Sequence, residues 1–354
     1  MELQPRTDRR IVIITHNDLD GAAAAASYLR IIGVKPQDAV ILFAEPYNVD
    51  QVIDRLTPYL EPHTTMAFMD IGFNSQSTPR AIDRLRSAAV KDLEVEWYDH
   101  HVWAEEDVSA VQRLGARLFV DRSTCGAGVV IRYASKLYGA EVDDFMNRLE
   151  RAVCAADLWR WDDPLAPKLF RASTSPPDTR NGQWKEKLVE KFFNGVLWDD
   201  ELQARLEGYL EEELANSSAE LRNSYSASSN GCVIASVVRD SDLPSDSILG
   251  SMLVSRAHAN AAALIKRKGF RRVSLSLRSR GVANVQVIAR RLGGGGHPRA
   301  SGASIILPIH VALLGMVSRK YIAKYVSQRL LEVAVETEAC KSTADAGGSQ
   351  GNSM

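Results

Sequence analysis

The sequence has few cysteines and no long apolar run. Its four cysteines are far apart and form no Cys-x-x-Cys pair: Cys125, Cys154, Cys232 and Cys340. This spacing argues against a structural zinc site, and we expect four inert thiols in a reducing cytosol. No apolar run approaches the roughly 20 residues that span a bilayer, and the short run at 11–14 is too brief for a signal peptide. We therefore expect a cytoplasmic protein with no membrane partner.

Acidic residues are absent from Ser247 to Leu331, although the whole 354-residue chain has a formal net charge of −1. This stretch carries fifteen lysines and arginines, so it cannot neutralise its own positive field. Such a field is typical of a domain that binds a polyanion. The alternative is a basic face that docks on the more acidic first part of the chain.

The remaining composition, 45% hydrophobic and 25% charged, is that of a globular protein, and the length indicates two domains. Apolar strands alternate with helical patterns in the first half, which predicts a doubly wound parallel sheet. We expect strands at 11–14, 39–43, 65–70 and 94–99, and helices at 21–32, 49–60, 78–89, 123–139 and 142–159. Thr78 and Ser123 are the expected N-caps of two of these helices.

The second half predicts a smaller α/β domain, with strands at 232–238, 261–266, 271–279 and 303–307 and a helix at 283–293. Residues 163–184 contain four prolines and read as a loop, and the charged stretch 199–222 reads as a connecting helix. The predicted organisation is a first domain over 8–184, a helical linker over 185–228, a second domain over 229–335 and a disordered tail over 336–354.

Carboxylates and histidines follow three of the predicted strands. His16, Asp18 and Asp20 come after the first, Asp70 after the third, and Asp99, His100 and His101 after the fourth. Ligands of doubly wound sheets bind beyond the carboxyl ends of the strands, so we expect these side chains to converge. Several carboxylates at one place need a compensating cation.

An oxygen-rich site with one or two imidazoles suits Mn²⁺, with Mg²⁺ as the second choice. The number of candidate ligands exceeds what one ion needs. Two ions roughly 3.5–4 Å apart that share one carboxylate would use them all. Any one of the three short patterns alone is a common turn or helix cap, and the prediction depends on their coincidence.

The segments "THNDLDG", "FMDIG" and "YDHHVW" resemble the first three motifs of the DHH phosphoesterase superfamily, and "CAADLW" resembles the fourth. The resemblance implies that His16, Asp18 and Asp70 hold a first metal ion. It implies that Asp20, Asp70, His100 and Asp157 hold a second. Asp99 would then orient the histidines and His101 would face the substrate phosphate. Asp162 and Asp163 are alternatives to Asp157, and Asn17 has no implied role.

The segment "GGGGHPRASGA" resembles the glycine-rich loop of the DHHA1 domain that accompanies DHH domains. The resemblance covers about 10–160 and 230–310. It implies that substrate is bound by Arg278, Gly293, Gly294, Gly295, Gly296, His297 and Arg299. Exposed backbone N–H groups of such a loop can approach a phosphate closely. Trp97, Trp103, Trp159 and Trp161 flank the metal motifs and either stack on bases or belong to the core.

The sequence therefore predicts a two-metal phosphodiesterase that hydrolyses single-stranded or short RNA or DNA oligonucleotides from one end. The first alternative is a small-molecule phosphoesterase acting on a linear or cyclic dinucleotide or on 3′,5′-bisphosphorylated adenosine. The second is a non-catalytic nucleic-acid-binding scaffold of the Cdc45 type. A homodimer and a protein partner in DNA repair or replication are left open.

Overall fold

The computed structural model of the chain describes residues 9–87, 92–174, 183–281 and 283–340. Two compact units divide between Gly208 and Tyr209, which lie within helix α9 (Asp200–Arg222). The helical connector predicted at 199–222 therefore matches α9 closely.

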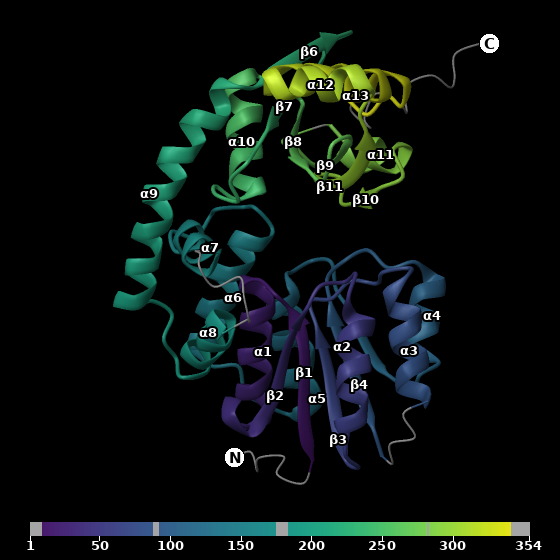
Figure 1. Ribbon diagram of the computed structural model, residues 1–354. Helices are drawn as coiled ribbons and strands as arrows, with labels where there is room; N and C mark the ends of the chain where they lie inside the picture. The colour runs from purple at the N-terminus through teal and green to yellow at the C-terminus, as the bar shows by residue number, and fades with distance from the viewer. Residues whose placement is uncertain (1–8, 88–91, 175–182, 282, 341–354) are drawn as a thin grey trace, which may run out of the picture. The chain divides into compact units, whose positions relative to one another are not determined.

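Unit 1 is built on a five-stranded sheet in the order β2-β1-β3-β4-β5, in which every neighbouring pair is parallel (Figure 1). The strands are β1 (Arg10–His16), β2 (Ala39–Ala44), β3 (Thr64–Met69), β4 (Glu94–Asp99) and β5 (Arg117–Val120). The predicted doubly wound parallel sheet is confirmed. Because the chain winds outward in both directions from β1, the switch in strand order falls between β1 and β3.

Helices cover both faces of this sheet. They are α1 (Leu19–Ile32), α2 (Val49–Leu56), α3 (Ser77–Ser87), α4 (Glu105–Gln112), α5 (Gly126–Tyr138), α6 (Asp144–Asp157), α7 (Ala166–Thr174) and α8 (Gln183–Phe193), with short 3₁₀ turns at Pro36–Asp38 and Thr57–Tyr59. Side chains of α2, α3 and α4 share one apolar core with the strands. The other face is covered by α1 and α5, and α8 packs on α1.

Several local predictions for unit 1 are corrected. Helix α3 begins at Ser77, whose N–H donates to Asn74 Oδ1 at 3.1 Å, so Thr78 is not its N-cap. Helix α5 begins at Gly126, and the Ser123 hydroxyl donates to Asp121 at 2.7 Å instead of capping it. The loop predicted at 163–184 contains α7, because Pro167 falls in the first turn, where its missing N–H is tolerated.

Unit 2 holds a six-stranded mixed sheet in the order β10-β11-β9-β8-β7-β6. Its strands are β6 (Tyr225–Ser229), β7 (Cys232–Val238), β8 (Ala261–Arg267), β9 (Arg272–Ser279), β10 (Gly295–Gly296) and β11 (Ala300–Ile306). Its helices are α10 (Asp246–Ala257), α11 (Val285–Arg291), α12 (Ile309–Val317) and α13 (Arg319–Glu336). One face packs on α11, α12 and α13 and the other on α10, which confirms a second, smaller α/β domain.

The cysteines differ from their predicted state. The structure pairs Cys125 with Cys154 and Cys232 with Cys340, with S–S distances of 2.04 and 1.99 Å, and no described cysteine is free. The prediction of four thiols is wrong because the partners are 29 and 108 residues apart and meet only through the tertiary fold. Cysteine spacing therefore no longer supports a reducing compartment.

The chain end differs from its prediction in part. Ala339 is buried and Cys340 is disulfide-bonded, although both fall in the tail predicted to be disordered. The rest of that tail, 341–354, lies outside the described residues. None of the helices in the described ranges is long and apolar enough to cross a membrane.

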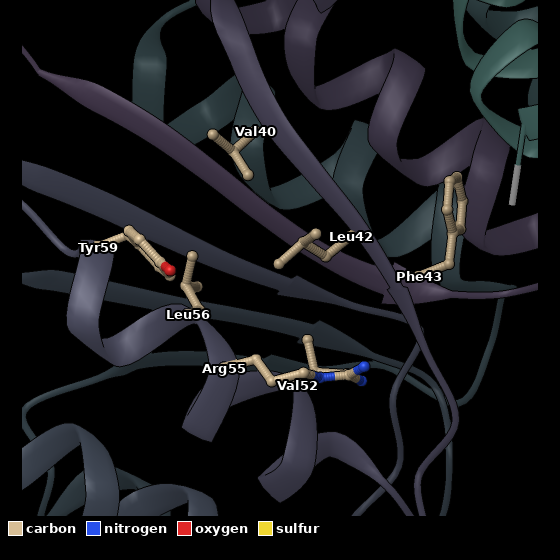
Figure 2. Close-up of a pocket in the computed structure, with 7 residues that line it drawn as sticks. All are labelled: Val40, Leu42, Phe43, Val52, Arg55, Leu56 and Tyr59. Atoms are coloured by element: carbon tan, nitrogen blue, oxygen red, sulfur yellow. The ribbon is translucent and has the colours of Figure 1, made fainter. Parts of the chain in front are cut away.

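A shallow apolar hollow of about 390 Å³ lies along the outer strand of the unit 1 sheet (Figure 2). It is lined by Val40 and Leu42 of β2 and by Val52 and Leu56 of α2, with Tyr59 at one end. No carboxylate or histidine is among the lining residues, so the chemistry of the chain lies elsewhere.

Candidate metal centre

The predicted ligands of unit 1 gather at the carboxyl edge of its sheet. β1 ends at His16, β3 ends one residue before Asp70, and β4 ends at Asp99. β1 and β3 are the two strands at the switch in strand order, where their following loops separate to opposite faces and leave a crevice. The fold thus brings together groups that are more than eighty residues apart in the sequence.

The first ligand group consists of His16, Asp18 and Asp70, which offer donor atoms within 4.8 Å of one another. His16 Nδ1 lies 2.9 Å from Asp18 Oδ2 and 3.5 Å from Asp70 Oδ2. Asp18 is also the N-cap of α1, and its Oδ1 accepts the N–H of Gly21 at 2.8 Å. Gly21 is required there, because a Cβ would lie 2.1 Å from the carbonyl oxygen of His16.

The second group consists of Asp20, His100 and Asp157, which likewise offer donor atoms within 4.8 Å of one another. His100 Nε2 lies 3.6 Å from Asp157 Oδ2 and 4.0 Å from Asp20 Oδ2. The same nitrogen lies 3.2 Å from Asp70 Oδ1. Asp157 is the last residue of α6, so its position is fixed by a helix packed in the core.

Asp70 stands between the two groups and turns one carboxylate oxygen toward each. Oδ2 faces His16, and Oδ1 faces His100. Its backbone has a φ of 55°, a left-handed conformation that costs free energy in a residue other than glycine. The backbone N–H of Asp70 donates to the carbonyl of Tyr98 at 2.9 Å, which helps hold this conformation. A carboxylate in this place has the geometry of a bridging ligand.

Two buried carboxylate oxygens of the cluster fit a cationic partner. Asp70 Oδ1 and Asp157 Oδ2 are buried without a well-oriented hydrogen bond from any described residue. Buried carboxylate oxygens are costly unless hydrogen-bonded or paired with a cation. The donor set of carboxylates and imidazoles, without thiolates, fits divalent cations such as Mn²⁺ or Mg²⁺.

Asp20 is held by the beginning of α5. Its Oδ2 accepts the N–H of Gly126 at 2.6 Å and its Oδ1 accepts the N–H of Ala127 at 2.8 Å. The positive end of the helix dipole stabilises this carboxylate. Gly126 also allows a close approach, because a Cβ at this position would lie 2.7 Å from Cβ of Asp70. The start of α5 therefore positions two of the predicted ligands.

Asp99 acts on the neighbouring histidine. It is fully buried, and its Oδ1 lies 2.8 Å from Nδ1 of His101. Its Oδ2 accepts the indole N–H of Trp103 at 2.5 Å and the backbone N–H of His101 at 3.1 Å. A proton on Nδ1, directed at Asp99, leaves Nε2 of His101 as the nitrogen available to a ligand.

The protonation of the cluster follows from burial and from mutual charge. Burial, more than the nearby Asp70, raises the pKa of Asp157 to about 7 against the opposing charge of His100. Burial lowers the pKa of His100, but Asp70 and Asp157 prevail and raise it to about 11. Burial, followed by the charges of Asp70 and Asp157, also raises the pKa of Asp20. Protons thus occupy positions in which a cation would be stabilised.

The three candidates for the fourth motif lie in different surroundings. Asp157 lies in the second ligand group. Asp162 lies on the surface, 3.3 Å from Arg160. Asp163 accepts the N–H of Leu165 at 2.9 Å in the turn before α7. The geometry favours Asp157 as the ligand.

The predicted substrate residues of unit 2 form one corner of its sheet. Gly295 and Gly296 make up β10 and pair with β11, and a tight turn from His297 to Ala300 joins the two strands. Gly294 needs its lack of a side chain, because a Cβ would lie 2.0 Å from the carbonyl of Gly302. Arg299 and His297 are exposed on this turn.

Arg278 lies on β9 directly opposite Ala300 of β11, so it neighbours the glycine-rich turn. Its stem packs where Gly250 of α10 leaves room, and its Nε donates to the Ser247 hydroxyl at 3.3 Å. Burial lowers the pKa of Arg278, with Asp246 as the opposing charge. Arg278 forms no ion pair with a residue of the described ranges, so its charge is available to a phosphate.

Residues 230–319 match the DHHA1 domain. Solved structures extend the likeness to the rest of the chain. The pGpG-specific phosphodiesterase PggH from Vibrio cholerae has a TM-score of 0.53 and 12% identity, and the match covers 89% of this chain and 99% of that one. RecJ from Thermus thermophilus, in complex with Mn²⁺, has a TM-score of 0.51 and 16% identity. The chain therefore contains a DHHA1 domain at 230–319, and its fold is similar to that of these two proteins.

Two further results limit what the comparisons show. The RecJ match covers 90% of this chain but 53% of the Thermus protein, so the chain spans about half of that RecJ. CDC45 from Entamoeba histolytica has a TM-score of 0.53 and 8% identity, with 92% of this chain and 96% of that one covered. At these identities the solved structures establish the fold alone. No protein with a curated description matches the sequence.

Glu45 also lies at the site, although the sequence analysis did not select it. It follows β2 directly, and its Oε2 lies 3.1 Å from Nε2 of His16. The strand-end rule that selected the other residues would have found it, because β2 lies beside β1 and ends at the same edge. It was overlooked because only one acidic residue follows that strand.

The tryptophans near the motifs fall into different environments. Trp97 is fully buried and stacks on Phe68, with ring centroids 4.3 Å apart, so it belongs to the core. Trp159 and Trp161 are half-buried and form a cluster with Phe170 of α7. Packing among themselves accounts for their positions.

Proposed function

We propose that the chain is a two-metal-ion phosphodiesterase that hydrolyses single-stranded or short oligonucleotides from one end. The observation that carries the proposal is the position of Asp70, whose two oxygens face two separate ligand groups. One carboxylate shared in this way is the arrangement expected where two divalent ions act on one phosphate.

In this proposal, His16, Asp18 and Asp70 hold one ion, and Asp20, Asp70, His100 and Asp157 hold the other. Two such ions supply an activated water and neutralise charge on the phosphate. Asp99 fixes the ring of His101 through Nδ1, so Nε2 can contact a phosphate oxygen. Trp103 donates to Asp99 and leaves that carboxylate no freedom to turn away.

Unit 2 is proposed to bind the phosphates of the substrate. The fifteen basic residues of the acid-free stretch 247–331 would provide the attraction, although Lys266, Arg291, Arg319 and Arg329 pair with acids outside it. Arg278 and the glycine-rich turn at 293–299 are the proposed contacts, because a half-buried guanidinium lies beside an exposed turn that carries His297 and Arg299.

The substrate could instead be a dinucleotide or a bisphosphorylated nucleoside. The observation that favours this second candidate is the match to PggH, a pGpG-specific phosphodiesterase of which 99% is covered. Salt distinguishes the two: binding of a long strand through many phosphates weakens steeply with salt, and binding of a dinucleotide weakens much less.

The test is Mn²⁺-dependent hydrolysis of end-labelled RNA and DNA, from dinucleotides to strands of about twenty nucleotides. We expect a ladder that shortens by one nucleotide at a time, and the labelled end gives the polarity. Asp70→Asn should abolish it, while Asp83→Asn, on the exposed face of α3, should not. Turnover of dinucleotides alone would select the second candidate. Binding of strands without metal-dependent hydrolysis of any substrate would leave a scaffold of the Cdc45 type.

A further inference from the structure

Helix α12 (Ile309–Val317) carries no Asp, Glu, Lys or Arg, and its one polar side chain is the exposed His310. One side is buried against α13: Val311 and Ala312 belong to the core, and a Cβ on Gly315 would lie 2.5 Å from the side chain of Ile322. The opposite side is open in unit 2 and exposes Ile309, Leu313, Leu314, Met316 and Val317. Apart from His310 the open side is as apolar as the buried one, and a wide apolar helix face is normally covered by another surface.

Two flanking residues enlarge the open side. Ile306, at the end of β11, is 62% exposed, and Tyr321, in the first turn of α13, is 47% exposed. We call these seven side chains the α12 patch: Ile306, Ile309, Leu313, Leu314, Met316, Val317 and Tyr321. Together they expose on the order of 700 Å², which exceeds the largest patch of a typical monomer and approaches the roughly 800 Å² that each partner contributes to a stable interface.

We propose that the α12 patch is the interface through which two copies of this chain form a two-fold symmetric dimer. A two-fold contact requires a surface that fits itself, with each residue meeting its reciprocal partner. The exposed residues of α12 are suited to this. Ile309 and Val317 lie four residues before and after Leu313, so two antiparallel copies of α12 would place Leu313 on the partner's Leu313 and Ile309 on the partner's Val317.

The charges around the patch are compatible with this pairing. The nearest basic residues, Arg319 and Lys320, follow the carboxyl end of α12, and Arg319 pairs with Asp240. Antiparallel helices would keep the two basic ends apart by about 14 Å, the length of nine helical residues, which exceeds the screening length of about 8 Å. A polyanion needs cations that the patch lacks, so this surface differs in kind from the proposed substrate surface.

The test is the mass of the full chain in solution by sedimentation equilibrium across about 0.1–50 µM, a range that resolves micromolar association. We expect a dimer for the wild type. Leu313→Glu places two carboxylates in contact at the centre of the interface and should weaken association at least about 30-fold, as for a central contact residue. Leu214→Glu is the matched control, because Leu214 is 69% exposed on α9, outside the patch; it should leave the dimer intact.

A pair of variants tests the antiparallel arrangement. Ile309→Glu and Val317→Lys should each be monomeric with an unchanged circular dichroism spectrum, since both positions are exposed. Mixing the two should restore a dimer, because the glutamate then meets the lysine and the remaining Ile–Val contact is native. A wild type that is monomeric at every concentration would overturn the proposal. A monomeric wild type that binds lipid vesicles through α12 would overturn it as well. A dimer that Leu313→Glu leaves unchanged would also overturn it. The proposal does not depend on the proposed hydrolysis.

Discussion

Glu45 and His16 form a contact that fixes one end of the metal centre. Oε2 of Glu45 lies 3.1 Å from Nε2 of His16, while Nδ1 of the same ring faces Asp18 and Asp70. If Nε2–H donates to Glu45, Nδ1 is the nitrogen left to bind a cation. Glu45 thus positions His16, and it comes from a strand that supplies none of the predicted ligands.

Replacement of Glu45 should weaken metal binding without removing a ligand. We expect Glu45→Ala to lower the affinity for one of two Mn²⁺ ions by about 10–100-fold, as for other partners of ligating histidines. Glu45→Gln keeps an acceptor oxygen and should lose less. Titration calorimetry or Mn²⁺ electron paramagnetic resonance measures both. Glu61→Ala is the control, because Glu61 is an exposed residue paired with Arg10 at the other edge of the sheet. Equal affinities for Glu45→Ala and wild type would contradict the positioning role.

The shared carboxylate should be needed for two ions to bind together. Asp70→Asn keeps the size of the side chain and tolerates the positive φ, so the fold should be retained. We expect the stoichiometry to fall from two Mn²⁺ ions to one or none. Two ions bound at wild-type affinity would rule out a bridging role.

Gly126 should be sensitive to the smallest substitution. A Cβ there would lie 2.7 Å from Cβ of Asp70 and 2.9 Å from its Cγ, so Gly126→Ala must displace Asp70 or the start of α5. We expect a loss of about 1–3 kcal/mol in the free energy of unfolding, measured by urea denaturation, and weaker Mn²⁺ binding. Gly208→Ala, in α9 with nothing within 4 Å of the added Cβ, should instead be neutral or stabilising by up to about 1 kcal/mol.

Metal binding should strengthen as pH rises from 6 to 8. In the metal-free protein the pKa of Asp157 is raised to about 7 and that of His100 to about 11, so both carry protons near pH 6. Raised pKa values stabilise the protonated fold, and that stability is lost as pH rises through them. A cation displaces these protons, so the Mn²⁺-induced rise in melting temperature should be larger at pH 8 than at pH 6. If the Mn²⁺-induced increase in melting temperature is smaller at pH 8 than at pH 6, the assignment of these two residues as ligands is contradicted.

The Cys125–Cys154 disulfide should stabilise the second ligand group. Cys125 immediately precedes α5, which holds Asp20, and Cys154 lies one turn before Asp157 in α6. Replacing both cysteines by alanine should lower the free energy of unfolding by about 2–4 kcal/mol, as for a typical disulfide. Peptide mapping without reductant establishes the bond, and denaturation with and without reductant measures its effect. If the free energy of unfolding of the wild type is the same with and without reductant, the stabilising role of the disulfide is contradicted.

Local patterns in the sequence predicted much of the fold. Alternating apolar strands and helices predicted the parallel sheet, because strands buried on both faces must be continuously apolar. The helix starts were not predicted correctly, because several polar side chains near Thr78 and Ser123 can accept the first N–H groups of a helix. Which of them does so depends on the direction in which the chain enters the helix. The four prolines of 163–184 led to the prediction of a loop, and α7 was therefore not predicted. Pro167 is compatible with this helix because it lies in the first turn.

The sequence by itself determined which residues stand at the ends of the strands, because a residue's place after an apolar run is a local property. It also determined the acid-free stretch from Ser247 to Leu331, since charge is additive along a chain. Only the tertiary structure decided that Glu45 reaches His16, that Asp70 turns one oxygen to each ligand group, and that the four cysteines pair. These contacts join atoms far apart in sequence, and their distances depend on how strands and helices pack, which no local pattern encodes.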